Sequence, residues 1–195
     1  MCFKVSQTST NESPKRDKTL RIAIFYGSTT CYTEMAGEKI QQQLETLLET
    51  KIDLFNIENT ALARAQQYDI IIFGISTWDF GELQEDWESS WEDIKDLQLT
   101  GKAVALYGLG DQLGYADWFQ DALGMLYEAL LPLHVNIIGF WPTSGYEYTA
   151  SKAEIGDGEF FVGLSLDDEN QYEDTDDRIE QWCNQLIEEL NQLSE

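Results

Sequence analysis

Hydrophobic positions along the chain fall into short apolar runs that alternate with longer amphipathic segments. Strongly apolar runs, typical of strands buried on both faces of a sheet, cover residues 20–26, 52–57, 68–75, 102–107 and 135–140. Segments with apolar positions on one helical face cover residues 34–48, 60–67, 116–131 and 176–193. Strands that alternate with helices in this way predict an α/β fold, a doubly wound parallel sheet with helices on both faces.

The first apolar run ends in a loop rich in hydroxyl groups, which reads Gly27-Ser28-Thr29-Thr30, and Thr33 opens the helix that follows. The unpaired N–H groups and the dipole of a helix N-terminus attract anions, and hydroxyl groups can complete the coordination of a phosphate. The loop contains no Lys or Arg and matches neither the P-loop nor the dinucleotide pattern. It therefore predicts a site for one terminal phosphate, with an ordinary capped βα turn as the alternative.

Two further loops each carry one large aromatic residue. Trp78 lies in the loop after the third apolar run, and Tyr115 lies in the loop after the fourth. Doubly wound sheets bind ligands at the carboxyl ends of their strands, where both loops are expected. Two exposed aromatic rings on neighbouring loops can enclose a flat ring, whereas either one alone is better explained by packing within its loop. Together with the hydroxyl loop they favour a planar cofactor that carries a phosphate.

Composition and charge narrow the possible functions of the 195-residue chain. There are 36 acidic and 12 basic residues, for a net charge of −24. This charge excludes nucleic acid and anionic membranes as partners and favours basic protein surfaces. A single histidine and three scattered cysteines argue against a Ser-His-Asp triad, a disulfide framework or a metal site. We expect a cytoplasmic protein, because the sequence contains neither an 18-residue apolar run nor a signal peptide.

The polar N-terminus predicts a disordered tail over residues 1–18, followed by one domain over residues 19–195. Within that domain, several segments resemble the long-chain bacterial flavodoxins in order and spacing, and they are most similar to the B-type flavodoxins of gamma-proteobacteria. These segments include GSTTCYTEMA, STWDFGELQEDW, ALYGLGDQLGYADWFQDALG and GFWPTSGYEYTASKA. The resemblance covers about residues 20–190. It implies a five-stranded sheet of order 2-1-3-4-5, in which an insertion over residues 143–160 splits the fifth strand and residues 161–166 resume it.

The resemblance also implies an FMN cofactor and assigns residues to it. Contacts to the phosphate fall on Ser28, Thr29, Thr30, Tyr32 and Thr33. Trp78 falls on the inner face of the flavin ring and Tyr115 on its outer face, with further ring contacts at Thr77, Gly81, Leu109, Gly110 and Asp111. Cys31, also in the loop, stands where the family usually has glycine. If this position requires a positive φ, the cysteine costs conformational energy.

The function that the resemblance implies is electron transfer without catalysis. Such a monomeric, low-potential carrier would shuttle electrons from the basic face of a ferredoxin/flavodoxin-NADP reductase to acceptor enzymes. Eight acids between Asp79 and Asp96 could steer these partners, although a run of charges is often only a solvated face. An FMN-dependent quinone or nitro reductase on the same fold is the alternative, but Tyr115 stacked on the ring would obstruct a substrate pocket. A receiver-type signalling domain is excluded, because no cluster of acids follows the first strand.

Overall fold

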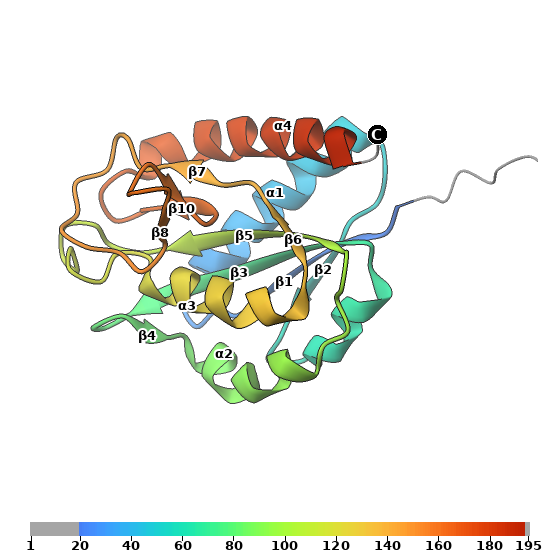
Figure 1. The fold of residues 1–195 in the computed structure, drawn as a ribbon. Helices are drawn as coiled ribbons and strands as arrows, with labels where there is room; N and C mark the ends of the chain where they lie inside the picture. The colour runs from blue at the N-terminus through green and yellow to red at the C-terminus, as the bar shows by residue number, and fades with distance from the viewer. Residues whose placement is uncertain (1–19, 194–195) are drawn as a thin grey trace, which may run out of the picture.

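The computed structural model describes residues 20–193, which form a central sheet covered by helices on both faces (Figure 1). The parallel strands follow the order β2 (Asp53–Asn56), β1 (Ile22–Tyr26), β3 (Ile70–Trp78), β5 (Ala103–Leu109). Two short strands share the outer edge of β5, namely β6 (Asn136–Ile138) and β10 (Leu164–Leu166). Counted as one interrupted fifth strand, they complete the order 2-1-3-4-5, so the predicted fold is confirmed. The two-residue strand β4 (Glu82–Leu83) folds back antiparallel onto the end of β3.

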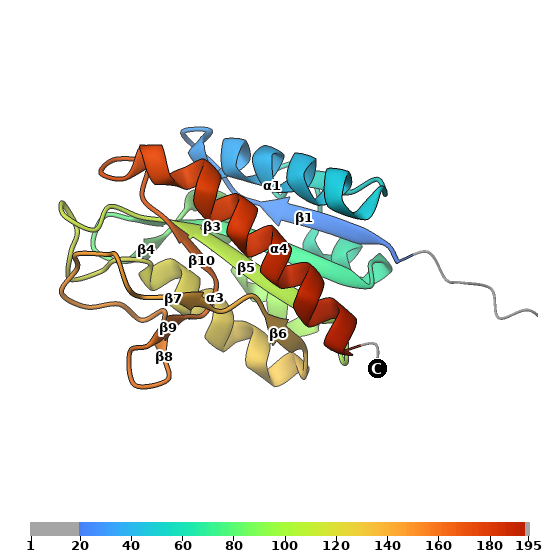
Figure 2. The same ribbon diagram turned by 90° about the horizontal axis from the view of Figure 1, so that it is seen from above.

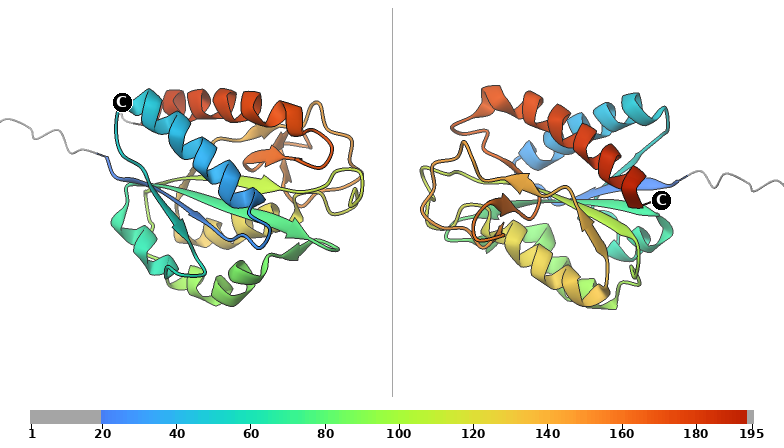
Figure 3. Two further views of the ribbon diagram at one scale, coloured as in Figure 1. Left: turned by 180° about the vertical axis from the view of Figure 1, so that it is seen from behind. Right: turned by 45° about the horizontal axis from the view of Figure 1, so that its top comes forward.

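The helices form two layers. One face of the sheet is covered by α1 (Tyr32–Leu48) and α4 (Thr175–Leu193), which cross it side by side in Figures 2 and 3. The other face is covered by α2 (Glu85–Ser90) and α3 (Asp121–Leu130). There are also short 3-10 helices, labelled η1 (Leu62–Gln67), η2 (Trp91–Asp96), η3 (Leu131–Leu133) and η4 (Tyr172–Asp174). Because helices cover both faces, every residue of β1 and β5 is buried, which explains their unbroken apolar sequences.

Tyr107 of β5 connects the sheet to the start of α1. Its ring is fully buried, and its hydroxyl donates a hydrogen bond of 2.9 Å to the carbonyl of Thr33. Gly74 makes room for it, since a Cβ there would lie 2.1 Å from the Tyr107 ring carbon Cζ. Burial raises the pKa of the Tyr107 phenol well above its ordinary value, so the group remains a neutral donor. The contact fixes α1 above the carboxyl ends of the strands.

The insertion in the fifth strand is wider than residues 143–160. The chain leaves the sheet after Ile138, with Gly139 at φ +78°, and returns at Leu164. In between, a small antiparallel sheet forms from β7 (Trp141–Pro142), β8 (Glu154–Ile155) and β9 (Phe160–Phe161). The expectation that residues 161–166 resume the fifth strand was therefore wrong at its first residues, because Phe161 pairs with Trp141 and Glu154 instead.

Two other boundaries differ from the sequence-based expectation. Residues 116–120 are not part of α3, which begins at Asp121 after a series of turns. The helix α2 was not predicted, because its six residues are too few to show a helical period. Within residues 20–193, no helix is both long and apolar enough to cross a bilayer. The predicted tail over residues 1–18 lies outside the described residues.

Candidate functional site

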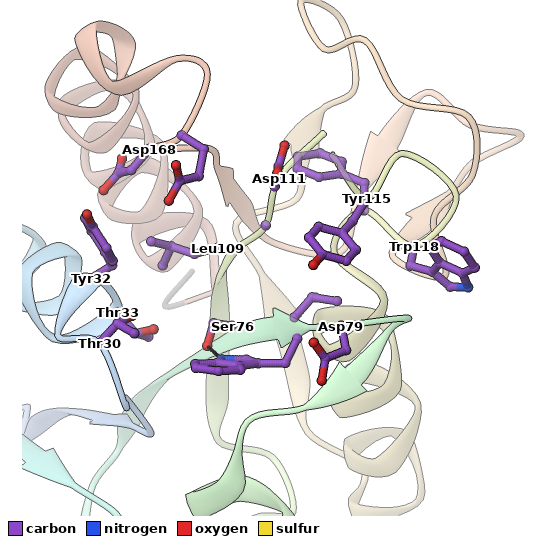
Figure 4. A pocket seen from close by; sticks show the side chains of 15 residues that line it. Thr30, Tyr32, Thr33, Ser76, Asp79, Leu109, Asp111, Tyr115, Trp118 and Asp168 are labelled. Carbon is purple, nitrogen blue, oxygen red and sulfur yellow. Dashed lines mark hydrogen bonds between the residues drawn. The ribbon is translucent and has the colours of Figure 1, made fainter. Parts of the chain in front are cut away.

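A pocket of about 310 Å³ opens where β3 and β5 end and α1 begins (Figure 4). It brings together most of the predicted site residues, namely Thr30, Tyr32, Thr33, Thr77, Trp78, Leu109, Gly110, Asp111 and Tyr115. Four others lie next to it without lining it, namely Ser28, Thr29, Cys31 and Gly81. In Figure 4, Thr30, Tyr32 and Thr33 project from the α1 side, whereas Tyr115 and Trp118 lie on the opposite side. The pocket thus has a hydroxyl-rich end and an aromatic end.

The hydroxyl-rich end is built on the N-terminus of α1. Cys31 precedes the helix with a left-handed backbone, at φ +69°, and no side chain caps the helix. The backbone at this position therefore has the positive φ that favours glycine, and Cys31 carries the conformational cost. The N–H groups of the first turn have no intrahelical acceptor, so they remain available to an anion.

Ser28 supplies the clearest sign that this loop accommodates a further group. Its Oγ is buried and has no hydrogen-bond partner among the described residues. An unpaired buried hydroxyl costs about 1–3 kcal/mol, so it calls for a partner that completes the site. A phosphate oxygen fits this donor.

Two residues at the start of α2 hold the hydroxyl loop in place, and the sequence analysis did not assign either of them to the site. Gln84 is buried, and its Nε2 donates to Thr29 Oγ1 at 3.0 Å while its Oε1 caps α2. The Asp86 carboxylate accepts the backbone N–H of Ser28 at 3.2 Å. Asp86 is therefore a structural partner of the hydroxyl loop rather than a free surface acid of the predicted run.

The aromatic end begins at the end of β3. The Trp78 Nε1 donates to Ser76 Oγ at 2.9 Å, which fixes the orientation of the indole. Thr77 Oγ1 accepts the N–H of Ala122 at 3.1 Å, and this bond ties the strand to the first turn of α3. Gly81 has φ +88°, and a Cβ there would lie 2.7 Å from the Asp121 carboxylate, so Gly81 shapes the turn.

Residues 110–116, here called the Tyr115 loop, form the opposite wall. The Asp111 carboxylate accepts the N–H groups of Leu113 at 3.1 Å and Gly114 at 2.7 Å. Burial alone would raise the pKa of Asp111, but hydrogen bonds from Gly114, Asn170 and Leu113 outweigh it and lower the pKa below its ordinary value. A Cβ at Gly114 would lie 2.1 Å from Asp111 Oδ2, so any side chain there would displace the Asp111 carboxylate.

Tyr115 is 40% exposed and lies on the side of the pocket opposite Thr30 and Tyr32 (Figure 4). Phe80 is 67% exposed and lies edge to face with the rings of both Tyr115 and Trp118. The ring centroids are 6.4 Å apart for Phe80 and Tyr115, and 5.1 Å apart for Phe80 and Trp118. The exposed Phe80 and Tyr115, together with the partly buried Trp118, form an apolar rim at the pocket.

Six lining residues were not predicted from the sequence, namely Ser76, Asp79, Trp118, Phe119, Asp168 and Glu169. Asp168 and Glu169 come after β10, and only the pairing of β10 with β5 brings them to the pocket. Together with Asp79 and Asp111 they give the pocket four acids, and no Lys or Arg is among the described lining residues. Negative charge that develops close to these carboxylates is therefore disfavoured.

The fold and the pocket together define a flavodoxin-like protein, and the comparisons with known proteins agree. The chain belongs to the flavodoxin family, whose model matches residues 24–182. It is 55% identical to Flavodoxin 2 of Salmonella typhi, over 88% of this chain and 97% of that protein. It is 53% identical to Flavodoxin 2 of Escherichia coli K12 over the same shares.

A solved structure shows the same architecture. The crystal structure of Fusobacterium nucleatum flavodoxin bound to flavin mononucleotide superposes with a TM-score of 0.80 at 29% identity. The match covers 87% of this chain and 98% of that one. The family of the chain and its fold are therefore both established.

Proposed function

We propose that this flavodoxin is a low-potential electron carrier that binds one FMN non-covalently and exchanges electrons with partner proteins. The observation that carries the proposal is the pocket itself, in which Thr30, Tyr32 and Thr33 line one end and Tyr115 lines the other. The unpaired Ser28 Oγ lies next to the first end, and no Lys or Arg is among the described lining residues. When bound, FMN accepts one electron and then a second, while the protein provides position and electrostatic environment.

Each part of the pocket would hold a different part of FMN. The phosphate would be held by the start of α1 and by the side chains of Ser28, Thr29, Thr30, Tyr32 and Thr33, with Cys31 at the turn. The ring would lie between Trp78 and Tyr115, next to the remaining predicted contacts at Thr77, Gly81, Leu109, Gly110 and Asp111. Most of these residues line the pocket, which supports the assignment.

The charges of the pocket support a low potential. Asp79, Asp111, Asp168 and Glu169 line the pocket, and the lowered pKa of Asp111 keeps that carboxylate ionised at neutral pH. These acids make a further negative charge on the ring costly, so they oppose the addition of electrons. An effect of this kind lowers the reduction potential.

The partners would be the basic faces of a ferredoxin/flavodoxin-NADP reductase and of electron-acceptor enzymes. Exposed acids on β4 and α2, such as Glu82, Glu85 and Glu88, lie close in sequence to Trp78 and would attract such faces. We place the monomeric protein in the cytoplasm, where a diffusible carrier can reach both its donor and its acceptors.

The test begins with the visible absorption spectrum of the purified protein and the chemical identity of the flavin that it releases. We expect FMN, and no oxidation of NADPH or NADH by the protein alone in the presence of a quinone. Addition of a flavoprotein reductase should start reduction. Release of FAD, or absence of any flavin together with failure of the apoprotein to bind FMN, would overturn the proposal. Steady-state NADPH oxidation by the protein alone would instead favour a quinone or nitro reductase.

A further inference from the structure

A buried hydrogen-bond network lies behind the Tyr115 loop and centres on Asp167. This residue follows β10 directly and has no exposed surface, and Gln112 beside it is 2% exposed. The Oδ2 of Asp167 accepts the backbone N–H of Gln112 at 3.0 Å and its side-chain Nε2 at 2.7 Å. A buried carboxylate that accepts several N–H donors holds them strongly, because leaving the charge unpaired would be costly.

Asn170 extends the network to the pocket. Its backbone N and its Nδ2 both donate to Asp167 Oδ1 at 3.0 Å, and its Nδ2 also lies 2.8 Å from Asp111 Oδ1. Asp167 therefore ties the Tyr115 loop to the turn that contains Asp168 and Glu169. Both segments line the same pocket.

The insertion in the fifth strand supplies a second set of bonds to the same loop. The N–H of Glu147 donates to Gln112 Oε1, and the N–H groups of Thr149 and Ala150 donate to the carbonyl of Ala116 at 2.8 and 3.0 Å. The insertion thus holds the Tyr115 loop on both sides of Tyr115. Figures 1 and 3 show the two segments side by side at the carboxyl end of the sheet.

From these contacts we propose that Gln112 and Asp167 are positioning residues for the flavin ring, acting through the Tyr115 loop without touching the cofactor. The inference rests on the proposed function. Tyr115 itself is 40% exposed, and the bonds at the base of its loop contribute to its position. A loop that is ordered before binding spares the ligand the entropy cost of ordering it, and this increases affinity for the ring.

The test compares Gln112→Met with the wild-type protein. Methionine keeps the length of the side chain but removes the side-chain bonds to Asp167 Oδ2 and to the N–H of Glu147, while the backbone bond to Asp167 remains. Apoproteins are titrated with FMN and with riboflavin, and the midpoint potentials of the bound FMN are measured. Because a bond to a charged group is lost, we expect both dissociation constants to rise about tenfold, together with a shift of the potentials. Asn170→Ala, which removes the side-chain bonds to Asp167 and Asp111, is the second variant if Gln112→Met does not fold.

Thr143→Val is the matched control, because Thr143 Oγ1 donates to the carbonyl of Gly158 at 2.7 Å, within the insertion. This variant should lower the unfolding midpoint and leave both flavin affinities unchanged. If Gln112→Met also lowers only the unfolding midpoint, the network is merely structural and the inference is wrong. A loss confined to FMN would also overturn it, because the effect would then act on the phosphate. If the wild-type apoprotein binds neither flavin, the proposed function fails instead.

Discussion

At the scale of single residues, the hydroxyl loop combines two unfavourable features. Ser28 leaves a buried hydroxyl unpaired, and Cys31 holds a left-handed backbone that its side chain disfavours. The unpaired hydroxyl costs about 1–3 kcal/mol. The left-handed backbone costs about 1–2 kcal/mol. Local strain and unpaired groups of this kind gather where a ligand binds.

Replacing Ser28 by alanine should separate stability from binding. The unfolding free energy of the apoprotein should stay the same or rise by up to about 1 kcal/mol, because an unpaired buried hydroxyl is removed. The affinity for FMN should fall by about 1–2 kcal/mol, and the affinity for riboflavin, which lacks the phosphate, should not change. Urea unfolding and flavin titrations measure the two effects. Thr46→Ala, on α1 away from the loop, should change neither affinity.

A second prediction concerns the backbone at Cys31. Cys31→Gly should raise the unfolding free energy of the apoprotein by about 0.5–1 kcal/mol, because the left-handed penalty exceeds the added entropy of the unfolded chain. Cys31→Ala should have little effect, since alanine pays the same penalty. If urea unfolding finds the glycine variant no more stable than the alanine variant, the positive φ of +69° is not a source of strain.

At the scale of elements, α2 has two roles on its two sides. Gln84 and Asp86, at its start, support the hydroxyl loop, while Glu85 and Glu88 point to solvent. The acid run from Asp79 to Asp96 is therefore not one uniform surface. Only its exposed members are available to a partner.

The exposed acids can be tested for electrostatic steering of a partner protein without disturbing Asp86, which supports the hydroxyl loop. Reversing Glu82 and Glu85 to lysine should slow electron transfer from a basic reductase at low salt and flatten the dependence of the rate on ionic strength. Stopped-flow transfer rates measure this directly. The matched control reverses Glu180 and Glu188 on α4, on the opposite face of the sheet, with the same change in charge. Equal effects of the two pairs would mean that only net charge matters.

At the scale of the whole molecule, the net charge of −24 acts against the compact state through self-repulsion. The ion pairs described are few and mostly at the surface, such as Lys95 with Glu92 and Lys51 with Asp53. Exposed pairs of this kind contribute little to stability. Repulsion should therefore dominate the response of the protein to salt.

We expect the thermal midpoint of the apoprotein to rise with sodium chloride. The screening length falls from about 30 Å at 0.01 M to about 8 Å at 0.15 M, which weakens repulsion between distant acids more than it weakens close pairs. Differential scanning calorimetry over this range tests the expectation. A midpoint that falls with salt would show that ion pairs outweigh repulsion.

Local patterns in the sequence determined where the strands lie and where the candidate site would form. The apolar runs placed the strands of the sheet, because burial on both faces requires unbroken apolar residues. The order 2-1-3-4-5 and the residue-level assignments came from the family resemblance. The hydroxyl loop, Trp78 and Tyr115 could be found because the ends of parallel strands share one edge of the sheet.

Tertiary structure alone decided the rest. Gln84 and Thr29 are 55 residues apart in sequence, and so are Gln112 and Asp167, yet each pair is joined by a hydrogen bond. Such partners follow no period along the chain, so neither α2 under the hydroxyl loop nor the network behind Tyr115 could be predicted. The start of α3 at Asp121 and the extent of the insertion also depend on contacts between residues far apart in the sequence, such as the bond between Ala122 and Thr77. Hydrophobic periodicity reports which face of an element is buried, but only the folded chain brings together the polar groups that shape the pocket.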